Sequence, residues 1–344
     1  MRDGDFVYNK GNSLRFPQGC IYQLRGWGEV AAPNVFICFR LKKGYSDGFF
    51  QSCFEKNAHG IQLKRHITSG ARSNGLLNIS RDTFFDVEIP TPSPAEQQKI
   101  AECLSTLDEL IGAESQKLDA LEAHKKGLMQ QLFPREGETR PRLRFPEFHS
   151  APEWVAKPLG DVVEVASGQV DPKEPPYCDF PQIGSENIES HSGKIVNVKS
   201  AREKGVISGN YVFDDTDVLY SKIRPALNKV AAPDFKGVCS ADIYPIRPAS
   251  GSLLRSYLLF LLLCERFLEY AIRSSDRGKI PKINRDALLT YEVQLPDPDE
   301  QHRIATCLSS IDDLIAAQSD RLAALQTHKQ GLLQQLFPTA GESA

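Results

Sequence analysis

Two short stretches of the sequence combine positive charge with side chains that form hydrogen bonds. "YSKIRPALNK" begins at Tyr220, and "RSSDRGKIPKINR" begins at Arg273. Lys and Arg pair with phosphate oxygens, whereas Asn, Ser and Tyr can also bond to the edges of nucleic-acid bases. A charged loop that is merely solvated is the alternative for each residue taken alone. Together the stretches indicate a candidate surface for a polyanion.

A comparable stretch lies within the first hundred residues. "LKRHITSGARSNGLLNIS" begins at Leu63 and precedes a strand-like segment, as the stretch from Arg273 also does. Two basic, glycine-bearing loops in matching places indicate a polyanion-binding surface more strongly than either loop alone. The residues that we expect to contact nucleic acid are Lys10, Lys64, Arg65, Arg72, Asn74, Tyr220, Lys222, Arg224, Asn228, Lys229, Arg273, Arg277, Lys279 and Lys282.

Signatures of catalysis and of metal binding are weak in this chain. "EPPY" at Glu174–Tyr177 is similar to the (Asn/Asp/Ser)-Pro-Pro-(Tyr/Phe) box of amino-methyltransferases, but Glu replaces the residue that holds the target amine. A Pro-rich turn is the preferred interpretation, and a stand-alone base methyltransferase is a minor alternative. The eight cysteines form no C-x-x-C pair, which favours reduced thiols in a cytoplasmic protein. We expect no catalytic residue, metal or cofactor on this chain.

Charge is distributed unevenly along the 344 residues. The whole chain carries a net charge of −3, yet residues 1–92 carry roughly +4, and residues 93–134 and 298–344 carry roughly −3 each. The acidic segments are therefore poor candidates for binding a polyanion. The most apolar run, from Tyr257, contains Glu265 and Arg266 and is too short and too charged to span a bilayer, so we expect no membrane partner.

The two acidic segments repeat one sequence. Residues 94–134 align without a gap with residues 298–338 at an offset of 204, and roughly 25 of the 41 positions are identical. The similarity extends upstream, where "NISRDTFFDVEIP" from Asn78 is similar to "KINRDALLTYEVQL" from Lys282. Still further upstream, "GDFVYNK" from Gly4 is similar to "TDVLYSK" from Thr216. The sequence thus predicts two related globules, each followed by the same long segment.

Each repeated segment has the pattern of a long amphipathic helix. It opens with Pro-x-Glu-Gln, closes at Leu-Phe-Pro, and places apolar residues at steps of four and three with two polar interruptions. Each helix would be about 55 Å long at 1.5 Å per residue. The seam residues, at which we also expect pairing and partner docking, are Ile100, Leu104, Leu107, Ile111, Glu114, Leu118, Leu121, Lys125, Leu128, Leu132, Ile304, Leu308, Ile311, Ile315, Gln318, Leu322, Leu325, Lys329, Leu332 and Leu336.

The polar seam residues favour an antiparallel coiled coil within the chain. A parallel pair in register would place Lys125 against Lys329, whereas one antiparallel register sets Glu114 against Lys329 and Lys125 against Gln318. Pairing with other chains, or packing on separate globules, is the alternative. Such a rod would hold two globules a fixed distance apart.

The fold class that follows is α+β, with two globules separated by two long helices. The second globule mixes strand-like segments, such as "DVVEVASG" and the strand pair "GNYVFDDTDVLYSKIRP", with a helix over the apolar run from Leu253. The first globule has no counterpart of the roughly sixty residues that precede Thr216 in the second, so we expect it to be truncated. The predicted boundaries are 1–92 for the partial first globule, 93–134 for the first helix, 135–144 for a linker, 145–297 for the second globule, 298–338 for the second helix and 339–344 for a tail.

These features resemble the DNA specificity subunit of Type I restriction–modification enzymes. The resemblance rests on "PSPAEQQKIAECLSTLDELI" and "PDPDEQHRIATCLSSIDDLI", each leading to "QQLFP". It also includes "RLRFPEFHSAPEWVAKPLGDVVEVASGQ", similar to the entry of a target-recognition domain, and "GARSNGLLNIS", similar to the end of one. The resemblance covers nearly the whole chain, and the repeated helices are its specific part.

The resemblance implies a non-catalytic subunit whose two target-recognition domains each read one half of a split site in double-stranded DNA. It implies that the helices space these domains and dock two methyltransferase (modification) subunits, which bind S-adenosylmethionine. Restriction (translocase–nuclease) subunits would join this core. The expected truncation of the first domain departs from the family pattern. The alternative from another class is a coiled-coil interaction scaffold without a role in DNA binding.

Overall fold

The computed structural model describes residues 1–11, 13–67, 75–249, 251–276 and 278–337. Its contacts group the chain into two compact units, each of which joins a globule to parts of the two long helices. Unit 1 comprises Met1–Asp119 and Ala317–Ala344, and unit 2 comprises Ala120–Ala316. This grouping differs from the predicted boundaries because the helix ends pack on the globules and do not form a separate layer.

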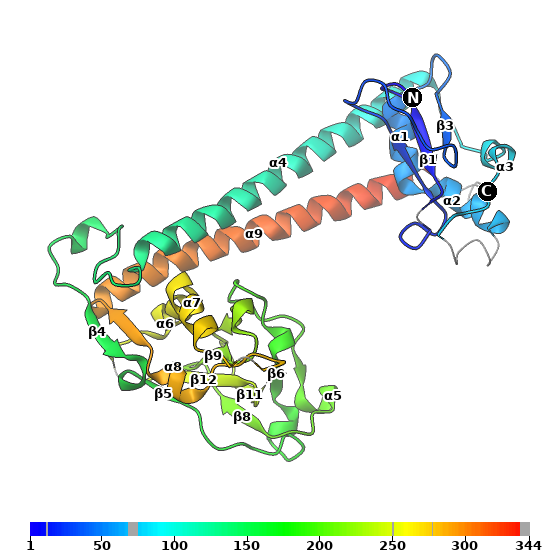
Figure 1. Cartoon of the computed structure of the whole chain (residues 1–344). Helices are drawn as coiled ribbons and strands as arrows, with labels where there is room; N and C mark the ends of the chain where they lie inside the picture. The colour runs from blue at the N-terminus through cyan, green and yellow to red at the C-terminus, as the bar shows by residue number, and fades with distance from the viewer. Residues whose placement is uncertain (12, 68–74, 250, 277, 338–344) are drawn as a thin grey trace. The chain divides into compact units, whose positions relative to one another are not determined.

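Each repeated segment is a single long helix. Helix α4 spans Pro94–Leu132 and helix α9 spans Pro298–Leu336 (Figure 1). Both begin at the Pro of the Pro-x-Glu-Gln motif, because Pro fits the first helical turn, whose N–H groups have no partner within the helix. Every predicted seam residue is buried or half-buried, as the spacing of apolar residues requires.

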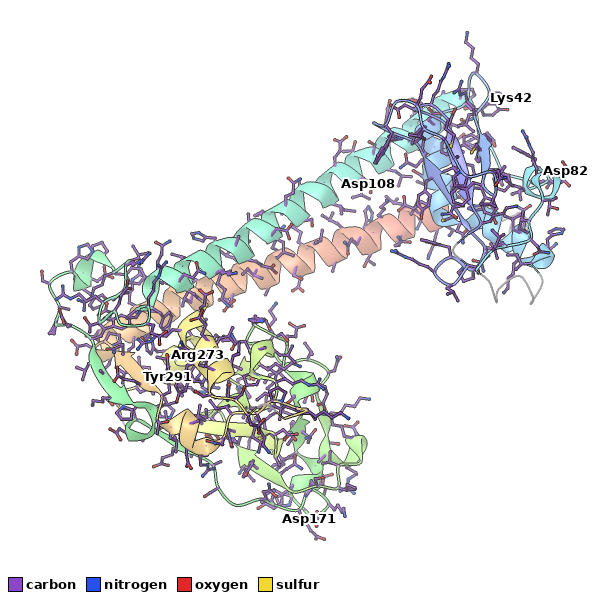
Figure 2. The ribbon with its side chains drawn as sticks, in the orientation of Figure 1. Lys42, Asp82, Asp108, Asp171, Arg273 and Tyr291 are labelled. Carbon is purple, nitrogen blue, oxygen red and sulfur yellow. The ribbon has the colours of Figure 1, made fainter. Side chains whose placement is uncertain are left out.

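Within unit 1 the first part of α4 lies antiparallel to the last part of α9. Gln318 Nε2 donates to Glu114 Oε2 at 2.6 Å, and Lys329 Nζ lies 2.7 Å from Asp108 Oδ1. Asp108 is labelled on α4 in Figure 2. The predicted contact between Glu114 and Lys329 is therefore wrong. The long side chain of Lys329 reaches Asp108, which flanks the seam. Glu114 and Gln318, which are equivalent positions of the repeat, contact each other.

The equivalent ion pair recurs within unit 2. Lys125 Nζ lies 2.5 Å from Asp312 Oδ1, and both residues are related to the Lys329–Asp108 pair by the offset of 204. The predicted contact of Lys125 with Gln318 is wrong for the same reason. The antiparallel direction holds in each unit, but the register is set by lysine–aspartate pairs.

The globule of unit 1 is a small three-stranded antiparallel sheet with helices against it. The strand order is β2–β1–β3, and Phe6 of β1 lies opposite Gln23 on one side and Phe39 on the other. Phe6, Phe49, Phe54 and Leu104 share a core, so the sheet packs through α1 onto α4. The elements are β1 Phe6–Asn9, β2 Cys20–Gln23, β3 Ile37–Phe39, α1 Asp47–Lys56, α2 Ala58–Leu63, the 3₁₀ turn η1 Lys64–His66 and α3 Arg81–Phe85.

The globule of unit 2 has two four-stranded sheets and a two-stranded ribbon. The strand orders are β10–β9–β12–β5, β7–β6–β11–β8 and β13–β4. The strands are β4 Val155–Pro158, β5 Val163–Val165, β6 Pro181–Ile183, β7 Lys199–Ser200, β8 Asn210–Phe213, β9 Val218–Ser221, β10 Val230–Ala231, β11 Gly237–Ser240, β12 Ile243–Pro248 and β13 Glu292–Leu295. The helices are α5 Ala201–Lys204, α6 Arg255–Leu263, α7 Glu265–Arg273 and α8 Arg285–Leu289, with 3₁₀ turns at Pro146–Phe148, Leu159–Asp161, Tyr177–Asp179, Ser185–Asn187 and Pro225–Leu227.

Two predictions for the second globule need correction. The segment expected to form a strand pair does contain two strands, β8 and β9, but they belong to different sheets. The turn between them therefore joins two layers and does not close a hairpin. The apolar run from Leu253 forms two helices, α6 and α7, which meet at Cys264 in an extended conformation.

The weak upstream similarity between the two globules is a real structural correspondence. Strands β1 and β9 each lie between two antiparallel neighbours, and an Asp precedes each of them. Arg40 Nε lies 2.5 Å from Asp5 Oδ1, and Arg247 lies 3.0 Å from Asp217 Oδ2. In each unit an arginine lies opposite that Asp, in register along the neighbouring strand, and forms an ion pair with its carboxylate. Strands β1, β2 and β3 thus correspond to β9, β10 and β12.

The glutamine of the Pro-x-Glu-Gln motif attaches each long helix to its globule. Gln97 Oε1 accepts from Ser46 N at 3.0 Å, and its Nε2 donates to Pro92 O at 2.8 Å. Gln301 Oε1 accepts from Leu254 N at 2.9 Å, and its Nε2 donates to Pro296 O at 2.8 Å. Both glutamines are buried. The motif therefore serves as a clamp as well as a helix start.

Over the described residues, no helix combines the length and the apolar character that a membrane span needs. The eight cysteines are free thiols, and burial raises the pKa of Cys53 to about 12. Burial likewise raises the pKa of Cys264 to about 11. These two side chains act as apolar core residues.

Candidate nucleic-acid interface

The two basic stretches singled out in the second globule lie side by side in unit 2. Ile223 and Lys282 form an antiparallel β-bridge. Arg224 N donates to Pro281 O at 2.7 Å, and Ile283 N donates to Lys222 O at 3.0 Å. These backbone bonds join the segment after β9 to the segment before α8. Residues 60 positions apart in sequence are thereby brought to one edge of the domain.

An aromatic ring organises two cations at this edge. Lys222 Nζ lies 5.2 Å from the centroid of the Tyr244 ring, and Arg285 Cζ lies 5.9 Å from it. Burial raises the pKa of the Tyr244 hydroxyl, so the ring stays neutral. Arg285 also donates to Ala166 O. Cation–π contacts of this kind hold positive groups without neutralising them.

Most positive groups at this edge have no anionic partner. In the part of the chain that the structure describes, none of Lys222, Arg224, Lys279, Lys282 and Arg285 forms an ion pair. Arg224, Lys279 and Lys282 are exposed, and Lys222 and Arg285 are half-buried. We name these five residues the basic edge. Unpaired cations on one edge provide the electrostatic footprint of a phosphate-binding surface.

Several residues that were predicted to contact nucleic acid are not part of the basic edge. Tyr220 is 1% exposed and belongs to the core, so its hydroxyl cannot reach a ligand. Asn228 is also buried, and its Nδ2 donates to Leu263 O at 2.9 Å. Both residues are therefore corrected to structural roles. Lys229 Nζ donates to Ser185 O, and Arg273, labelled in Figure 2, pairs with Glu136 at 3.2 Å. Arg277 lies outside the described residues.

Unit 1 carries a smaller version of this arrangement. Lys10 follows β1 as Lys222 follows β9, and Leu77 N donates to Lys10 O at 2.9 Å. Lys10 Nζ, however, donates to Ile79 O at 2.8 Å and is half-buried. Lys64 and Arg65 are exposed on η1, away from any described ion pair. The predicted residues Arg72 and Asn74 lie outside the described residues.

Among the described residues no three or more His, Cys, Asp and Glu side chains gather to hold a metal ion. The "EPPY" stretch forms a turn in which Cys178 N donates to Glu174 O at 3.1 Å. Tyr244 is the one organising residue that sequence reasoning missed. It lies on β12, between the two basic stretches in sequence but in neither of them, and no spacing rule connects it to them.

Comparison with known proteins identifies the family. The Type I restriction modification DNA specificity domain matches residues 29–123 and 152–327. The chain belongs to this family. It is 28% identical over 301 residues to the specificity subunit of the Type I restriction enzyme EcoDI of Escherichia coli. The aligned region covers 79% of this chain and 66% of that protein. It is 25% identical to the MjaVIII specificity subunit of Methanocaldococcus jannaschii, over 90% of this chain and 77% of that protein.

Solved structures share the fold. A chain from a structural study of complex assembly and conformational transition in the type I R-M system matches with a TM-score of 0.62 and 18% identity, over 97% of this chain and 82% of that one. The S subunit of a Type I restriction–modification system from M. genitalium matches with a TM-score of 0.60 and 12% identity, over 99% and 84%. These matches establish a mixed helix-and-sheet fold with two domains and long helices.

Proposed function

We propose that this chain is the DNA-specificity subunit of a Type I restriction–modification complex and that unit 2 binds duplex DNA through its basic edge. The observation that carries the proposal is the Ile223–Lys282 bridge, which brings unpaired cations to one edge of unit 2. The chain also belongs to a family of DNA specificity domains. Lys222, Arg224 and Lys282 would contact phosphates. The Ser- and Asn-bearing loops beside them would reach base edges in the major groove.

The repeat supports recognition of a DNA site in two parts. The three strands of unit 1 repeat the arrangement of β9, β10 and β12 in unit 2, and unit 1 carries Lys10, Lys64 and Arg65 in comparable places. Each unit would read one half of a split site. The long helices would pair as an antiparallel coiled coil, which would set the spacing between the two halves.

The long helices would also dock two modification subunits. Leu110 is 39% exposed and Leu314 is 56% exposed, although both are large apolar residues. They are related by the offset of 204, so the repeat presents the same apolar point twice. Two copies of one partner would bind two equivalent points.

Chemistry would reside in the partners. The modification subunits would bind S-adenosylmethionine and methylate the DNA, and the restriction (translocase–nuclease) subunits would join the complex in the cytoplasm. This chain would contribute sequence recognition alone. The matched relatives are named as specificity subunits, and no catalytic motif was found in the sequence.

The test measures binding of the chain, in complex with its modification subunit, to duplex DNA over a range of salt concentrations. Released counterions give a linear fall of log affinity with log salt, with a slope of about −0.9 per neutralised phosphate. We expect Arg224→Ala and Lys282→Ala each to weaken binding and to reduce the slope by about one. Assembly with the modification subunit should be unchanged.

Lys199→Ala is the matched control, since Lys199 is exposed on β7 outside the basic edge. It should leave affinity and slope as they are. Binding that is insensitive to salt, or an equal loss in the control, would rule out the basic edge as the DNA contact. A chain that assembles with partners but retains no DNA would favour the scaffold.

A further inference from the structure

Two exposed apolar residues lie among the cations of the basic edge. Leu227 is 39% exposed, and Ile280 is 48% exposed. Leu227 lies three residues after Arg224, and Ile280 lies between Lys279 and Lys282 in sequence. The backbone bonds between the two basic segments bring the stretches that carry them to the same edge of unit 2. We name Leu227 and Ile280 the apolar pair.

The turn that carries Leu227 is held in one conformation. The 3₁₀ turn Pro225–Leu227 lies between Arg224, with φ 47°, and Asn228, with φ 43°. Residues other than glycine rarely adopt this left-handed conformation and keep it only where surrounding contacts impose it. Here Pro225 is buried, and Asn228 Nδ2 donates to Leu263 O at 2.9 Å. The exposed position of Leu227 therefore belongs to a fixed turn.

Unit 1 repeats this feature in the corresponding loop, which follows β1 as the turn of Leu227 follows β9. The loop carries Leu14, which is 88% exposed, beside the exposed Arg15. The Tyr8 hydroxyl of β1 donates to Gln18 O at 2.7 Å and so attaches the loop to the strand. An exposed leucine with an exposed arginine close to it in sequence thus occurs in the same loop of both units, although the two loops differ in sequence.

Charge and apolar character together define what the apolar pair would contact. Apolar residues scattered singly over a protein surface are ordinary. The apolar pair differs because the cations beside it form no ion pair within the described chain, so an occupant would offer both phosphates and an apolar group. On the base edges that line the major groove of duplex DNA, the C5 methyl of thymine is that apolar group.

We propose that the apolar pair contacts thymine C5 methyl groups in the major groove, so that unit 2 selects thymine at one or two positions of its binding site. The inference rests on the proposed function, in which the basic edge binds duplex DNA. Cations of the basic edge hold the phosphates, and the apolar pair lies against the base edges between them. Contact removes the methyl group and the aliphatic side chain from water, and cytosine, which has no C5 methyl, offers no such gain.

The test removes the methyl group from the DNA. The complex of the chain with its modification subunit first selects duplexes from a random library. In a selected duplex, deoxyuridine then replaces one thymidine at a time, and binding is measured by fluorescence anisotropy. At one or two positions we expect a loss of affinity of about fourfold, the value for exposing one buried methyl group. The salt dependence should stay the same, because no phosphate contact is lost.

Variants of the protein locate the contact. Leu227→Ala and Ile280→Ala should each weaken binding of the thymine duplex at least threefold without changing its salt dependence. At the thymine position that each residue contacts, the variant should be indifferent to deoxyuridine, so the combined loss is smaller than the product of the separate losses. Equal midpoints of thermal unfolding for the wild type and the variants show that the fold is intact.

Ile207→Ala is the matched control, since Ile207 is 75% exposed between α5 and β8 in the same unit. It should leave both the affinity and the response to deoxyuridine unchanged. A loss in the control equal to that of Leu227→Ala would overturn the proposal.

The remaining outcomes separate this inference from the proposed function. Salt-dependent binding in which no thymine responds to deoxyuridine in the wild type would overturn the methyl contact and leave the proposed function in place. A response to deoxyuridine that persists in Leu227→Ala and in Ile280→Ala would overturn it too, because another part of the protein would then contact the methyl group. Absence of salt-dependent binding to any duplex would remove the proposed function and this inference with it.

Discussion

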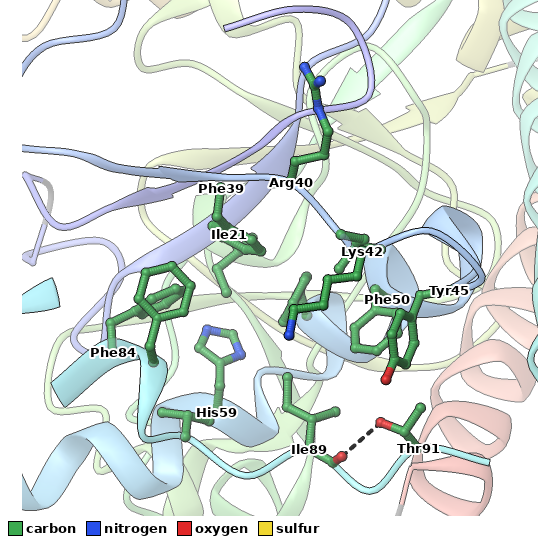
Figure 3. Close-up of a pocket in the computed structure, with 14 residues that line it drawn as sticks. Ile21, Phe39, Arg40, Lys42, Tyr45, Phe50, His59, Phe84, Ile89 and Thr91 are labelled. Atoms are coloured by element: carbon green, nitrogen blue, oxygen red, sulfur yellow. Dashed lines mark hydrogen bonds between the residues drawn. The ribbon is translucent and has the colours of Figure 1, made fainter. Parts of the chain in front are cut away.

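His59 is an ionisable residue of unit 1 that is buried on α2 (Figure 3), and neither of its ring nitrogens bonds to a described residue. Burial lowers its pKa from about 6.5 to about 4, and no described anion compensates. Because the unfolded histidine takes up a proton near pH 6.5 and the folded one does not, falling pH favours the unfolded state. The stability contributed by neutral burial is complete above pH 6.5 and is lost as pH falls from 6.5 towards 4.

The corresponding prediction concerns His59→Phe. Between pH 7 and pH 4.5 the wild-type chain should lose about 2 to 3 kcal/mol of the stability of unit 1 that the variant keeps. Hydrogen exchange of the α1 and α2 amides, compared between the two proteins at each pH, measures this difference. A difference that does not change with pH would show that His59 titrates normally.

Charge alone did not identify the residues of the candidate interface. Lys222 and Tyr220 are two positions apart on one strand end, yet Lys222 reaches the surface while Tyr220 is buried. Successive side chains of a strand point to opposite faces, so residues two apart share a face until the strand ends. The chain leaves β9 at Ser221, and that change of direction separates the two residues. The end of a short strand is poorly determined by sequence, so this separation could not be predicted.

At the scale of the elements, the glutamine clamps lead to a second prediction. Gln301 is fully buried and makes three hydrogen bonds to backbone groups, including Ser252 O at 2.8 Å. Gln301→Ala leaves Leu254 N and two carbonyls without these partners, so unit 2 should lose about 2 to 3 kcal/mol of stability. Urea unfolding followed by fluorescence of Trp154, which is buried in unit 2, measures the loss. Gln130→Ala is the control, since Gln130 is a partly exposed glutamine in the same unit, and it should cost under about 0.5 kcal/mol.

The lysine–aspartate pairs lead to a third prediction. Burial raises the pKa of Asp312, and Lys125 partly offsets that rise. Lys125→Met keeps the apolar stem but leaves the carboxylate unpaired, so unit 2 should lose roughly 2 kcal/mol at pH 7. The double variant with Asp312→Asn should lose less than the two single losses combined. Lys126→Met, at an exposed position, should be neutral, and an equal loss there would mean that the pair contributes nothing.

The helices show how far sequence reasoning extends. Their bounds, their seam and their antiparallel direction follow from apolar spacing, from the terminal Pro residues and from the like charges of Lys125 and Lys329. The register does not follow, because a lysine in the seam can reach residues on either side of it. Asp108 and Asp312 lie outside the seam pattern, so no rule about the seam selects them.

At the scale of the whole molecule, the repeat produces equivalent features in two sequence contexts. The ion pairs Lys329–Asp108 and Lys125–Asp312, and the clamps of Gln97 and Gln301, each occur once per repeat. The globules depart from this equivalence beside β3 and β12, because β12 also pairs with β5, whereas β3 pairs only with β1 among the described strands. A duplicated framework with unequal globules suits the proposed binding of two equal partners and of two different DNA sequences.

The last prediction concerns those two equal partners. If one modification subunit docks at each exposed leucine, Leu110→Asp or Leu314→Asp alone should reduce the complex from two modification subunits to one. The double variant should bind none, because a carboxylate in an apolar contact stays desolvated and unpaired. Native mass spectrometry of the reconstituted complex counts the subunits directly. Ser105→Asp with Ser309→Asp places the same charge on another exposed side of both helices and should leave two subunits bound. Loss of both copies from a single variant would mean that the two partners bind cooperatively, and not at independent repeated points.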